Sequence, residues 1–197
     1  MLPEPIAVTL QVIDALEQVG ARYVIGGSLA STVHGVVRTT LDTDIVADLS
    51  LRQAQPFADL LAGAFYLDLE SIRHAIRTRS SFNVIHLATM FKVDVFIPKG
   101  RPFDRQQLDR RQPWIADSDS GRMIYVATPE DTVLAKLAWR RLGDEISDRQ
   151  LRDQWRDILG VLAVQGNRLD RSYLSQWATL LGVSDLLERA LAEIGRD

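Results

Sequence analysis

Residues 25–45, IGGSLASTVHGVVRTTLDTDI, are the most informative part of this sequence. Near the end of this stretch is Asp42-Thr43-Asp44, in which two aspartates are separated by one residue. Side chains at this spacing on a strand point to the same face, with Cα atoms about 7 Å apart. Two adjacent carboxylates repel unless positive charge lies between them, and hard oxygen ligands of this kind suit magnesium. Taken alone the pattern is weak, because surface aspartates at the end of a strand produce it equally well.

A third aspartate strengthens this interpretation. In a strand expected near residues 91–97, Lys92 and Asp94 alternate with apolar residues in a run otherwise suited to burial. Asp94 placed beside Asp42 and Asp44 makes a three-carboxylate site for two cations about 3.5 to 4 Å apart, as used for in-line displacement at phosphorus. Lys92 is either a phosphate contact or a neutralising neighbour, and the residues alone do not decide between the two.

The small residues Gly26, Gly27 and Ser28 lie between an expected strand, 23–25, and an expected helix, 29–34. Small residues let the backbone approach a ligand, and a helix start presents free N–H donors to an anion. A triphosphate fits such a turn, with Ser28 suited to cap the helix. The sequence is neither a P-loop, which needs a following Lys-Ser or Lys-Thr, nor a dinucleotide fingerprint, which needs a third glycine.

Periodicity predicts an α+β fold, in which a small mixed β-sheet core flanked by helices is followed by a C-terminal helical bundle. The predicted domains are 1–127 and 128–197, because the pattern becomes wholly helical after Thr128, a helix cap that precedes Pro129. We expect further helices near 6–16, 51–64, 70–79 and 103–110, strands near 41–47 and 82–87, a hairpin around 118–121, and C-terminal helices near 129–142, 155–162, 173–181 and 186–191.

The order and spacing of these features resemble the polymerase-β-like nucleotidyltransferase superfamily over about residues 22–97. The resemblance is carried by Gly26-Gly27-Ser28-Leu29-Ala30, Arg38-Thr39-Thr40-Leu41-Asp42-Thr43-Asp44 and Lys92-Val93-Asp94-Val95-Phe96. Together with the Pro-Glu-Asp helix start at 129–131, these strings look most like bacterial AbiEii/MenT-type nucleotidyltransferases.

This resemblance implies a magnesium-dependent enzyme that uses two ions and moves an NMP group from a nucleoside triphosphate to an acceptor hydroxyl. The implied metal ligands are Asp42, Asp44 and Asp94, the implied nucleotide-binding residues are Gly26, Gly27, Ser28, Arg38 and Lys136, and the implied catalytic residues are the three aspartates with Lys136 and Asp157. Asp153 lies one helical turn before Asp157 on nearly the same face and is the alternative. Arg38 either assists phosphate binding or pairs with an aspartate.

The acceptor is less constrained. Arginines cluster within 73–79 and 101–111, which favours a phosphate-bearing acceptor such as RNA, with tRNA the first candidate. The resemblance also implies a toxin with a cognate antitoxin as partner, although catalysis by itself does not imply toxicity. Two alternatives stay open, a non-catalytic module that binds a nucleotide or a protein partner, and a small-molecule nucleotidyltransferase that modifies an antibiotic.

Composition sets outer bounds on these expectations. The 197 residues carry a net charge of −3, so extensive wrapping of nucleic acid is not expected. Without cysteine there is no disulfide framework and no thiolate zinc site, which is typical of a cytoplasmic protein, and we expect no signal peptide or membrane segment. The histidines His34, His74 and His86 form no ligand pair at helical spacing, and no serine or cysteine triad is recognisable.

Overall fold

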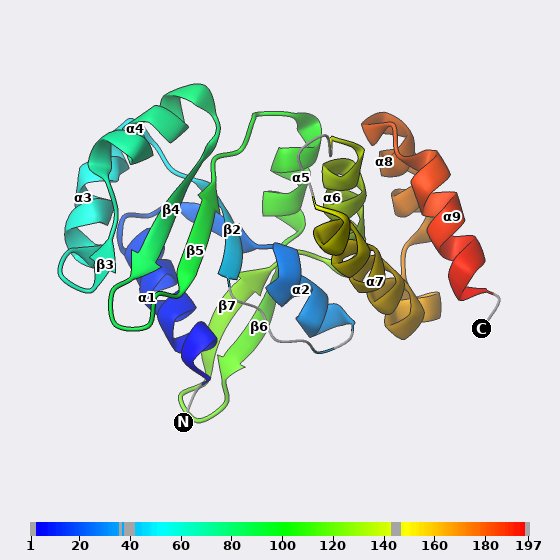
Figure 1. Ribbon diagram of the computed structural model, residues 1–197, viewed down its shortest axis with the longest axis horizontal. Coiled ribbons are helices and arrows are strands. Elements are labelled where there is room, and N and C mark those ends of the chain that lie inside the picture. The colour runs from blue at the N-terminus through cyan, green and yellow to red at the C-terminus, as the bar shows by residue number, and fades with distance from the viewer. Residues whose placement is uncertain (1–2, 36, 38–41, 143–146, 196–197) are drawn as a thin grey trace. The chain divides into compact units, whose positions relative to one another are not determined.

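The computed structural model describes residues 3–35, 37, 42–142 and 147–195 (Figure 1). The helices are α1 (Glu4–Gln18), α2 (Gly27–His34), α3 (Leu51–Leu61), α4 (Leu69–Thr78), α5 (Pro102–Arg110), α6 (Pro129–Arg141), α7 (Asp148–Gln165), the short 3-10 helix η1 (Gly166–Arg168), α8 (Arg171–Leu181) and α9 (Ser184–Ile194). The strands are β1 (Arg22–Ile25), β2 (Asp42–Asp48), β3 (Phe65–Tyr66), β4 (Ser81–His86), β5 (Lys92–Phe96), β6 (Gln112–Asp117) and β7 (Arg122–Val126).

The chain forms two compact units. The first comprises Met1–Gly26 and Thr39–Ala127, and the second comprises Gly27–Arg38 and Thr128–Asp197. One boundary between the units falls where the sequence changes to a wholly helical pattern, between Ala127 and Thr128. Residues 27–38 differ from the expectation, because α2 belongs to the same unit as the C-terminal helices and not to the unit that contains the sheet.

The first unit is built on a mixed sheet whose described strands lie in the order β3-β4-β5-β2-β1-β7-β6. β2 and β5 run parallel, as do β1 and β7, while the other neighbouring pairs run antiparallel. The predicted hairpin of β4 with β5 is confirmed, and so is the hairpin that turns near residues 118–121. The two-residue strand β3 was not predicted, because it is too short to show alternation.

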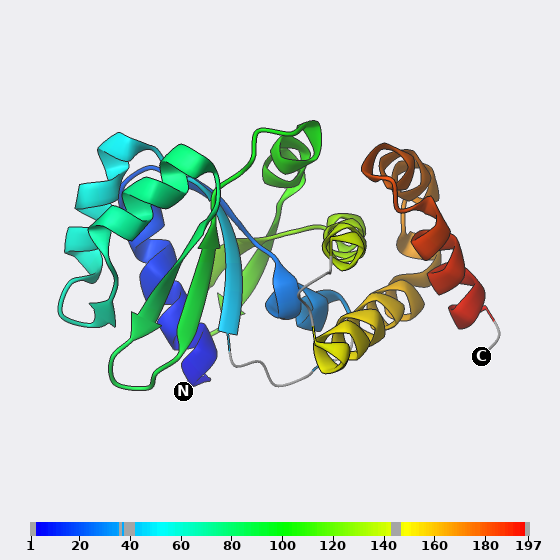
Figure 2. The same ribbon diagram turned by 45° about the horizontal axis from the view of Figure 1, so that its top comes forward.

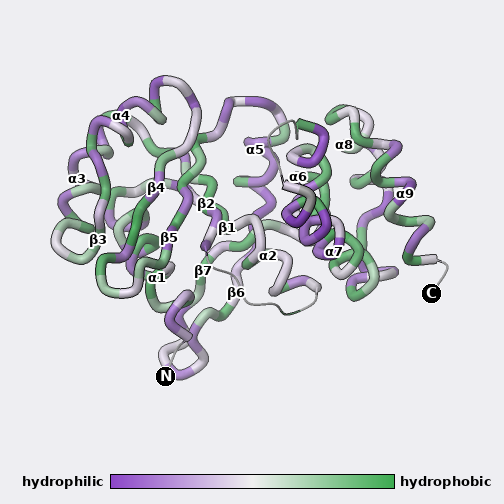
Figure 3. Tube along the Cα trace, in the orientation of Figure 1, coloured by the Kyte–Doolittle hydropathy of each residue, from purple (hydrophilic) through white to green (hydrophobic). Residues whose placement is uncertain are grey.

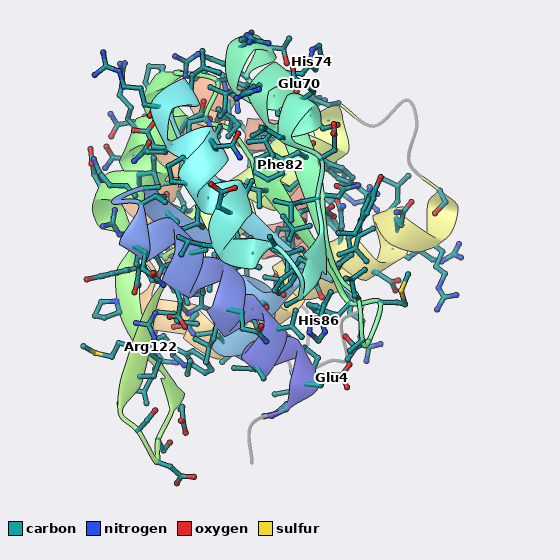
Figure 4. All side chains as sticks on the ribbon, turned by 90° about the vertical axis from the view of Figure 1, so that its left-hand side faces the viewer. Glu4, Glu70, His74, Phe82, His86 and Arg122 are labelled. Carbon is teal, nitrogen blue, oxygen red and sulfur yellow. The ribbon has the colours of Figure 1, made fainter. Side chains whose placement is uncertain are left out.

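Helices α1, α3 and α4 cover one face of this sheet (Figures 1 and 2). In α1, Thr9 Oγ1 lies 3.0 Å from Oγ1 of Thr43 in β2, and the ring of Phe57 in α3 packs edge-on against Phe82 in β4. Figure 4 shows Phe82 among the side chains beneath these helices. Apolar alternation along the strands produces this buried face, since every second residue points toward the helices.

Helix α5 packs on the opposite face of the sheet. Its Leu108 forms a small buried cluster with Val24 and Ala127, against which Val46 of β2 packs. Phe103 is also buried, and most of the other residues of α5 are hydrophilic, so the helix is drawn mostly in purple in Figure 3. On this second face, α5 therefore covers the part of the sheet near β1 and β2.

The second unit is helical, as predicted. Thr128 caps α6 by accepting a hydrogen bond from the backbone N–H of Asp131, with Pro129 in the first turn. The largest fully buried side chains of its core come from α6, α7 and α8, and they are Leu134, Leu137, Ile158, Leu162 and Leu174. Gly182, at φ +69°, ends α8 before α9 begins at Ser184.

Candidate functional site

The three predicted carboxylates lie on neighbouring strands of the first unit. In the parallel pair of β2 and β5, Asp42 is opposite Lys92 and Asp44 is opposite Asp94. Directly paired residues point to the same side of a sheet, so all four side chains share one face. Thr43 alternates with the aspartates and is buried on the helix-covered face. Asp94 thus lies on the same side of the sheet as Asp42 and Asp44, which the predicted site requires.

Lys92 is the cation at the centre of this acidic group. Its Nζ lies 2.6 Å from Oδ2 of Asp94 and 4.0 Å from Oδ2 of Asp42. The Asp94 side chain is only 14% exposed, whereas the Lys92 side chain is 39% exposed and reaches solvent. Lys92 was expected to be either a phosphate contact or a neutralising neighbour of the carboxylates. The structure shows the neutralising contact.

The electrostatics of Lys92 reflect this position. Partial burial acts to lower the pKa of Lys92, but the hydrogen bond with Asp94 and the charges of Asp94, Asp42 and Asp44 outweigh it. The net effect raises the pKa of Lys92 above its ordinary value, so the ammonium stays protonated at neutral pH. The negative charges of all three carboxylates therefore favour the protonated lysine.

The donor chemistry of this group fits magnesium. Three carboxylates on one exposed face offer the hard oxygen ligands that magnesium prefers. In their present conformation they surround the Lys92 ammonium, and no group of three histidine, cysteine or acidic side chains within the described ranges converges on a common cation position. A metal ion that bound Oδ2 of Asp94 would compete with the ammonium of Lys92 for that oxygen.

The glycine turn begins beside the carboxylates. The backbone N–H of Gly26 donates to the carbonyl of Asp44 at 2.9 Å, and a Cβ on Gly26 would meet no atom within 4 Å. Gly27 follows with φ +54°, a left-handed conformation that glycine adopts without strain. Helix α2 starts at Gly27, so Ser28 is the second residue of the helix and does not precede it as a cap. Arg38, the remaining predicted nucleotide contact, lies outside the described residues.

In the second unit, the two other predicted catalytic residues bind each other. Nζ of Lys136 in α6 donates to Oδ2 of Asp157 in α7 at 2.9 Å. The two side chains are 9% and 4% exposed, so this is a buried ion pair. Asp153 instead lies at the surface, 4.0 Å from Arg149 on its own helix. The geometry separates the two candidates and associates Asp157, not Asp153, with Lys136.

A second buried polar contact lies at the start of α6. Asp131 is completely buried, and its Oδ1 accepts a hydrogen bond of 2.5 Å from the hydroxyl of Tyr173 in α8. Glu130 next to it accepts from the backbone N–H of Asp170. The sequence did not indicate these roles, because acidic residues are common in the first turn of any helix.

The histidines do not offer a competing site among the described residues. His86 bonds Thr89 through Nδ1 and packs its ring on Phe65, while His74 is exposed on α4. Figure 4 shows His74 near the top of the first unit and His86 well below it. This separation agrees with the absence of metal-ligand spacing in the sequence.

Comparison with solved structures identifies the fold. The antibiotic-resistance factor ANT(2'')-Ia in solution aligns with a TM-score of 0.55 at 11% identity over 97% of this chain and 95% of its own. Its crystal structure in complex with adenylyl-2''-tobramycin gives 0.56 at 11% identity, covering 89% and 95%. An antigenic nucleotidyltransferase-like protein from Paracoccidioides brasiliensis gives 0.55 at 18% identity, covering 97% and 94%. The chain therefore has a nucleotidyltransferase-like fold with a helical C-terminal region.

Sequence comparison adds nothing to this result, since no protein-family model and no curated protein matches the chain. Across the described residues, no helix combines the length and apolar character that crossing a membrane requires.

Proposed function

We propose that this protein is a magnesium-dependent nucleotidyltransferase that moves an NMP group from a nucleoside triphosphate to an acceptor hydroxyl. The observation that carries the proposal is the row of Asp42, Asp44 and Asp94 on one face of parallel strands β2 and β5. The fold adds support, because one neighbour of similar fold holds adenylyl-2''-tobramycin, an acceptor that carries a transferred nucleotidyl group.

In the proposed reaction, the acceptor oxygen bonds to the α-phosphorus while the bond from that phosphorus to the bridging oxygen breaks. Pyrophosphate leaves with the electron pair. We assign Asp42 and Asp44 as ligands of two magnesium ions, and Asp94 as a ligand that also accepts the proton of the attacking hydroxyl. Bound magnesium supplies positive charge to the phosphate oxygens and lowers the pKa of the attacking hydroxyl.

The triphosphate-binding residues of the proposal are Gly26, Gly27, Ser28, Arg38 and Lys136. The backbone of Gly27 and the start of α2 offer N–H donors to an anion. Lys136 supplies positive charge, and Asp157 orients its ammonium through their hydrogen bond. Positioning by these groups accounts for much of the expected rate enhancement, because phosphoryl transfer needs little covalent chemistry from the protein.

Substitution of the carboxylates tests this assignment. Asp42→Asn and Asp94→Asn each keep the size of the side chain but remove a charged metal ligand, so we expect nucleotide transfer to fall at least about a hundredfold. Asp48→Asn is the matched control, because Asp48 ends the same strand at an exposed position beyond Val46. Transfer that persists in either test variant at the rate of the control would discard the assignment.

We favour RNA, with tRNA first, as the acceptor because of the arginine clusters. The test is incubation with magnesium and each labelled triphosphate in turn, offering total RNA, cell protein and small hydroxyl compounds. Label in RNA supports this acceptor, and label confined to another class refutes it. Toxicity and a cognate antitoxin stay predictions from the sequence resemblance.

A small-molecule acceptor is the second candidate, favoured by the similarity in fold to ANT(2'')-Ia and its tobramycin adduct. Label in a small hydroxyl compound in the same screen would support it. A non-catalytic binding module is distinguished by calorimetry, since such a module would bind triphosphate without magnesium and release no pyrophosphate with any acceptor.

A further inference from the structure

Two arginine-rich segments that are distant in sequence meet at one edge of the first unit. Arg79 follows α4 in a left-handed conformation, φ +52°. Its Nη1 donates to the carbonyl of Pro98 at 2.8 Å and lies 3.9 Å from the position that a Cβ on Gly100 would occupy. The end of α4 is thereby held against the loop that leads to Arg101 and α5.

The sheet explains why these segments converge. β4 and β5 are antiparallel, with Ser81 opposite Phe96, and the N–H of Ile97 donates to the carbonyl of Ser80. The start of β4 and the end of β5 therefore lie at the same edge, together with the end of α4 and the start of α5. Figure 1 shows these ends of helices and strands along the top of the first unit.

We call Arg77, Arg79, Lys99, Arg101 and Arg105 the basic edge. All five side chains are exposed. Within the described part of the chain, Arg101 forms an ion pair with Asp104, whereas Arg77, Lys99 and Arg105 form none. Uncompensated charges gathered on one surface attract a polyanion far more than dispersed charges do.

We propose that the basic edge binds the phosphate backbone of an RNA acceptor whose terminal hydroxyl reaches the carboxylates. This inference rests on the proposed function and assigns the surface that would bind the acceptor. β5 links the two places, since Asp94 and Pro98 are four residues apart on an extended chain, about 13 Å. Helix α5 lies on the carboxylate side of the sheet, because its Leu108 packs against Val24 and Val46 on that face.

The charges select the class of acceptor. A backbone phosphate forms charge-assisted hydrogen bonds with arginine and lysine, whereas a polycationic small molecule is repelled by the surplus of positive charge on the basic edge. Phosphate contacts carry little base information, so the basic edge positions the strand while other residues choose the terminal nucleotide.

The first test measures binding of a short single-stranded RNA to the full chain by fluorescence anisotropy across a salt series. The test variant combines Arg77→Gln, Lys99→Gln and Arg105→Gln, which leaves the structural bonds of Arg79 and Arg101 intact. The control variant combines Arg52→Gln, Arg149→Gln and Arg171→Gln, three exposed and dispersed positions with the same change in net charge.

Each phosphate contact contributes about 0.7 to the slope of log affinity against log salt concentration for a single strand. We expect the salt dependence to become shallower by about 2 in the slope of the test variant, and the slope of the control to stay unchanged. Equal slopes in the two variants would overturn the proposal. So would binding of anionic phosphatidylserine vesicles that depends on the basic edge while RNA binding does not.

A second measurement separates this inference from the proposed function. Calorimetric binding of triphosphate with magnesium is expected to be the same in the test variant and the native chain, because the basic edge lies away from the carboxylates. RNA binding that depends on the basic edge, in a chain that transfers no nucleotide to any acceptor, supports the phosphate contact of the basic edge and refutes the proposed function. Transfer to RNA that the test variant performs as well as the control refutes the inference and leaves the function intact.

Discussion

At the residue scale, Asp42, Asp44 and Asp94 share one face of the sheet with Lys92, whose ammonium contacts Asp94. The spacing of Asp42, Asp44 and Asp94 within apolar runs implied that each points away from the buried face of its strand. The pairing of Lys136 with Asp157 could not be derived, because it depends on how α6 and α7 pack and not on either local sequence. The family resemblance implies a role for each residue but gives no reason to expect contact between them.

Lys92 yields the first residue-scale prediction. In Lys92→Met the three carboxylates lose their cation, so we expect lower stability without magnesium and a larger gain in melting temperature when magnesium is added. The control is Lys99→Met, which removes a lysine beyond the end of the same strand. An unchanged response to magnesium in Lys92→Met would contradict the view that ammonium and metal compete.

We also predict that the stabilising contribution of Lys92 depends on pH. Because the pKa of Lys92 is raised on folding, its stabilising contribution is fully present below the unfolded pKa of about 10.4 and is lost as pH rises through the folded value. The stability difference between the native chain and Lys92→Met should therefore be constant from about pH 7 to 9 and shrink above about pH 10.5. Urea denaturation at several pH values measures it. A difference that already disappears near pH 8 would contradict the assignment.

The buried pair in the second unit supplies another residue-scale prediction. Asp157→Asn leaves the Lys136 ammonium without its charged partner in a buried position, which costs about 3 to 5 kcal/mol of stability. Lys136→Met combined with Asp157→Leu removes both charges and should recover most of that loss. Asp153→Asn is the exposed control and should change stability by less than about 0.5 kcal/mol. Equal unfolding midpoints for Asp157→Asn and this control would show that the pair is not buried in solution.

At the element scale, most helices and strands could be predicted because their apolar residues repeat with the period of the element that contains them. Helix α3 ends at Leu61, three residues before the expected end, since periodicity locates a helix better than its last turn. The grouping of α2 with the C-terminal helices could not be foreseen, because it depends on contacts with residues more than a hundred positions later.

Gly35 makes this grouping testable. A Cβ at Gly35 would lie 2.9 Å from the backbone nitrogen of Val161 in α7 and 3.0 Å from the carbonyl oxygen of Ser31. Backbone atoms cannot move aside as a side chain can, so Gly35→Ala should destabilise the second unit by about 1 to 3 kcal/mol. Gly195→Ala is the milder control, since its nearest contact would be 3.4 Å. Equal thermal stability of the two variants would show that α2 and α7 do not pack this closely.

At the scale of the whole molecule, the fold should form without metal, because the sheet buries its own apolar face beneath α1, α3 and α4 and the carboxylates have Lys92 as counterion. We therefore expect chelation to abolish nucleotide transfer while circular dichroism stays unchanged. Magnesium at about a hundred times its dissociation constant should add about 2.7 kcal/mol of stability. Asp42→Asn should lose most of that gain and Asp48→Asn should keep it. A full gain in Asp42→Asn would place the metal elsewhere, whereas unfolding on chelation would make the ion structural.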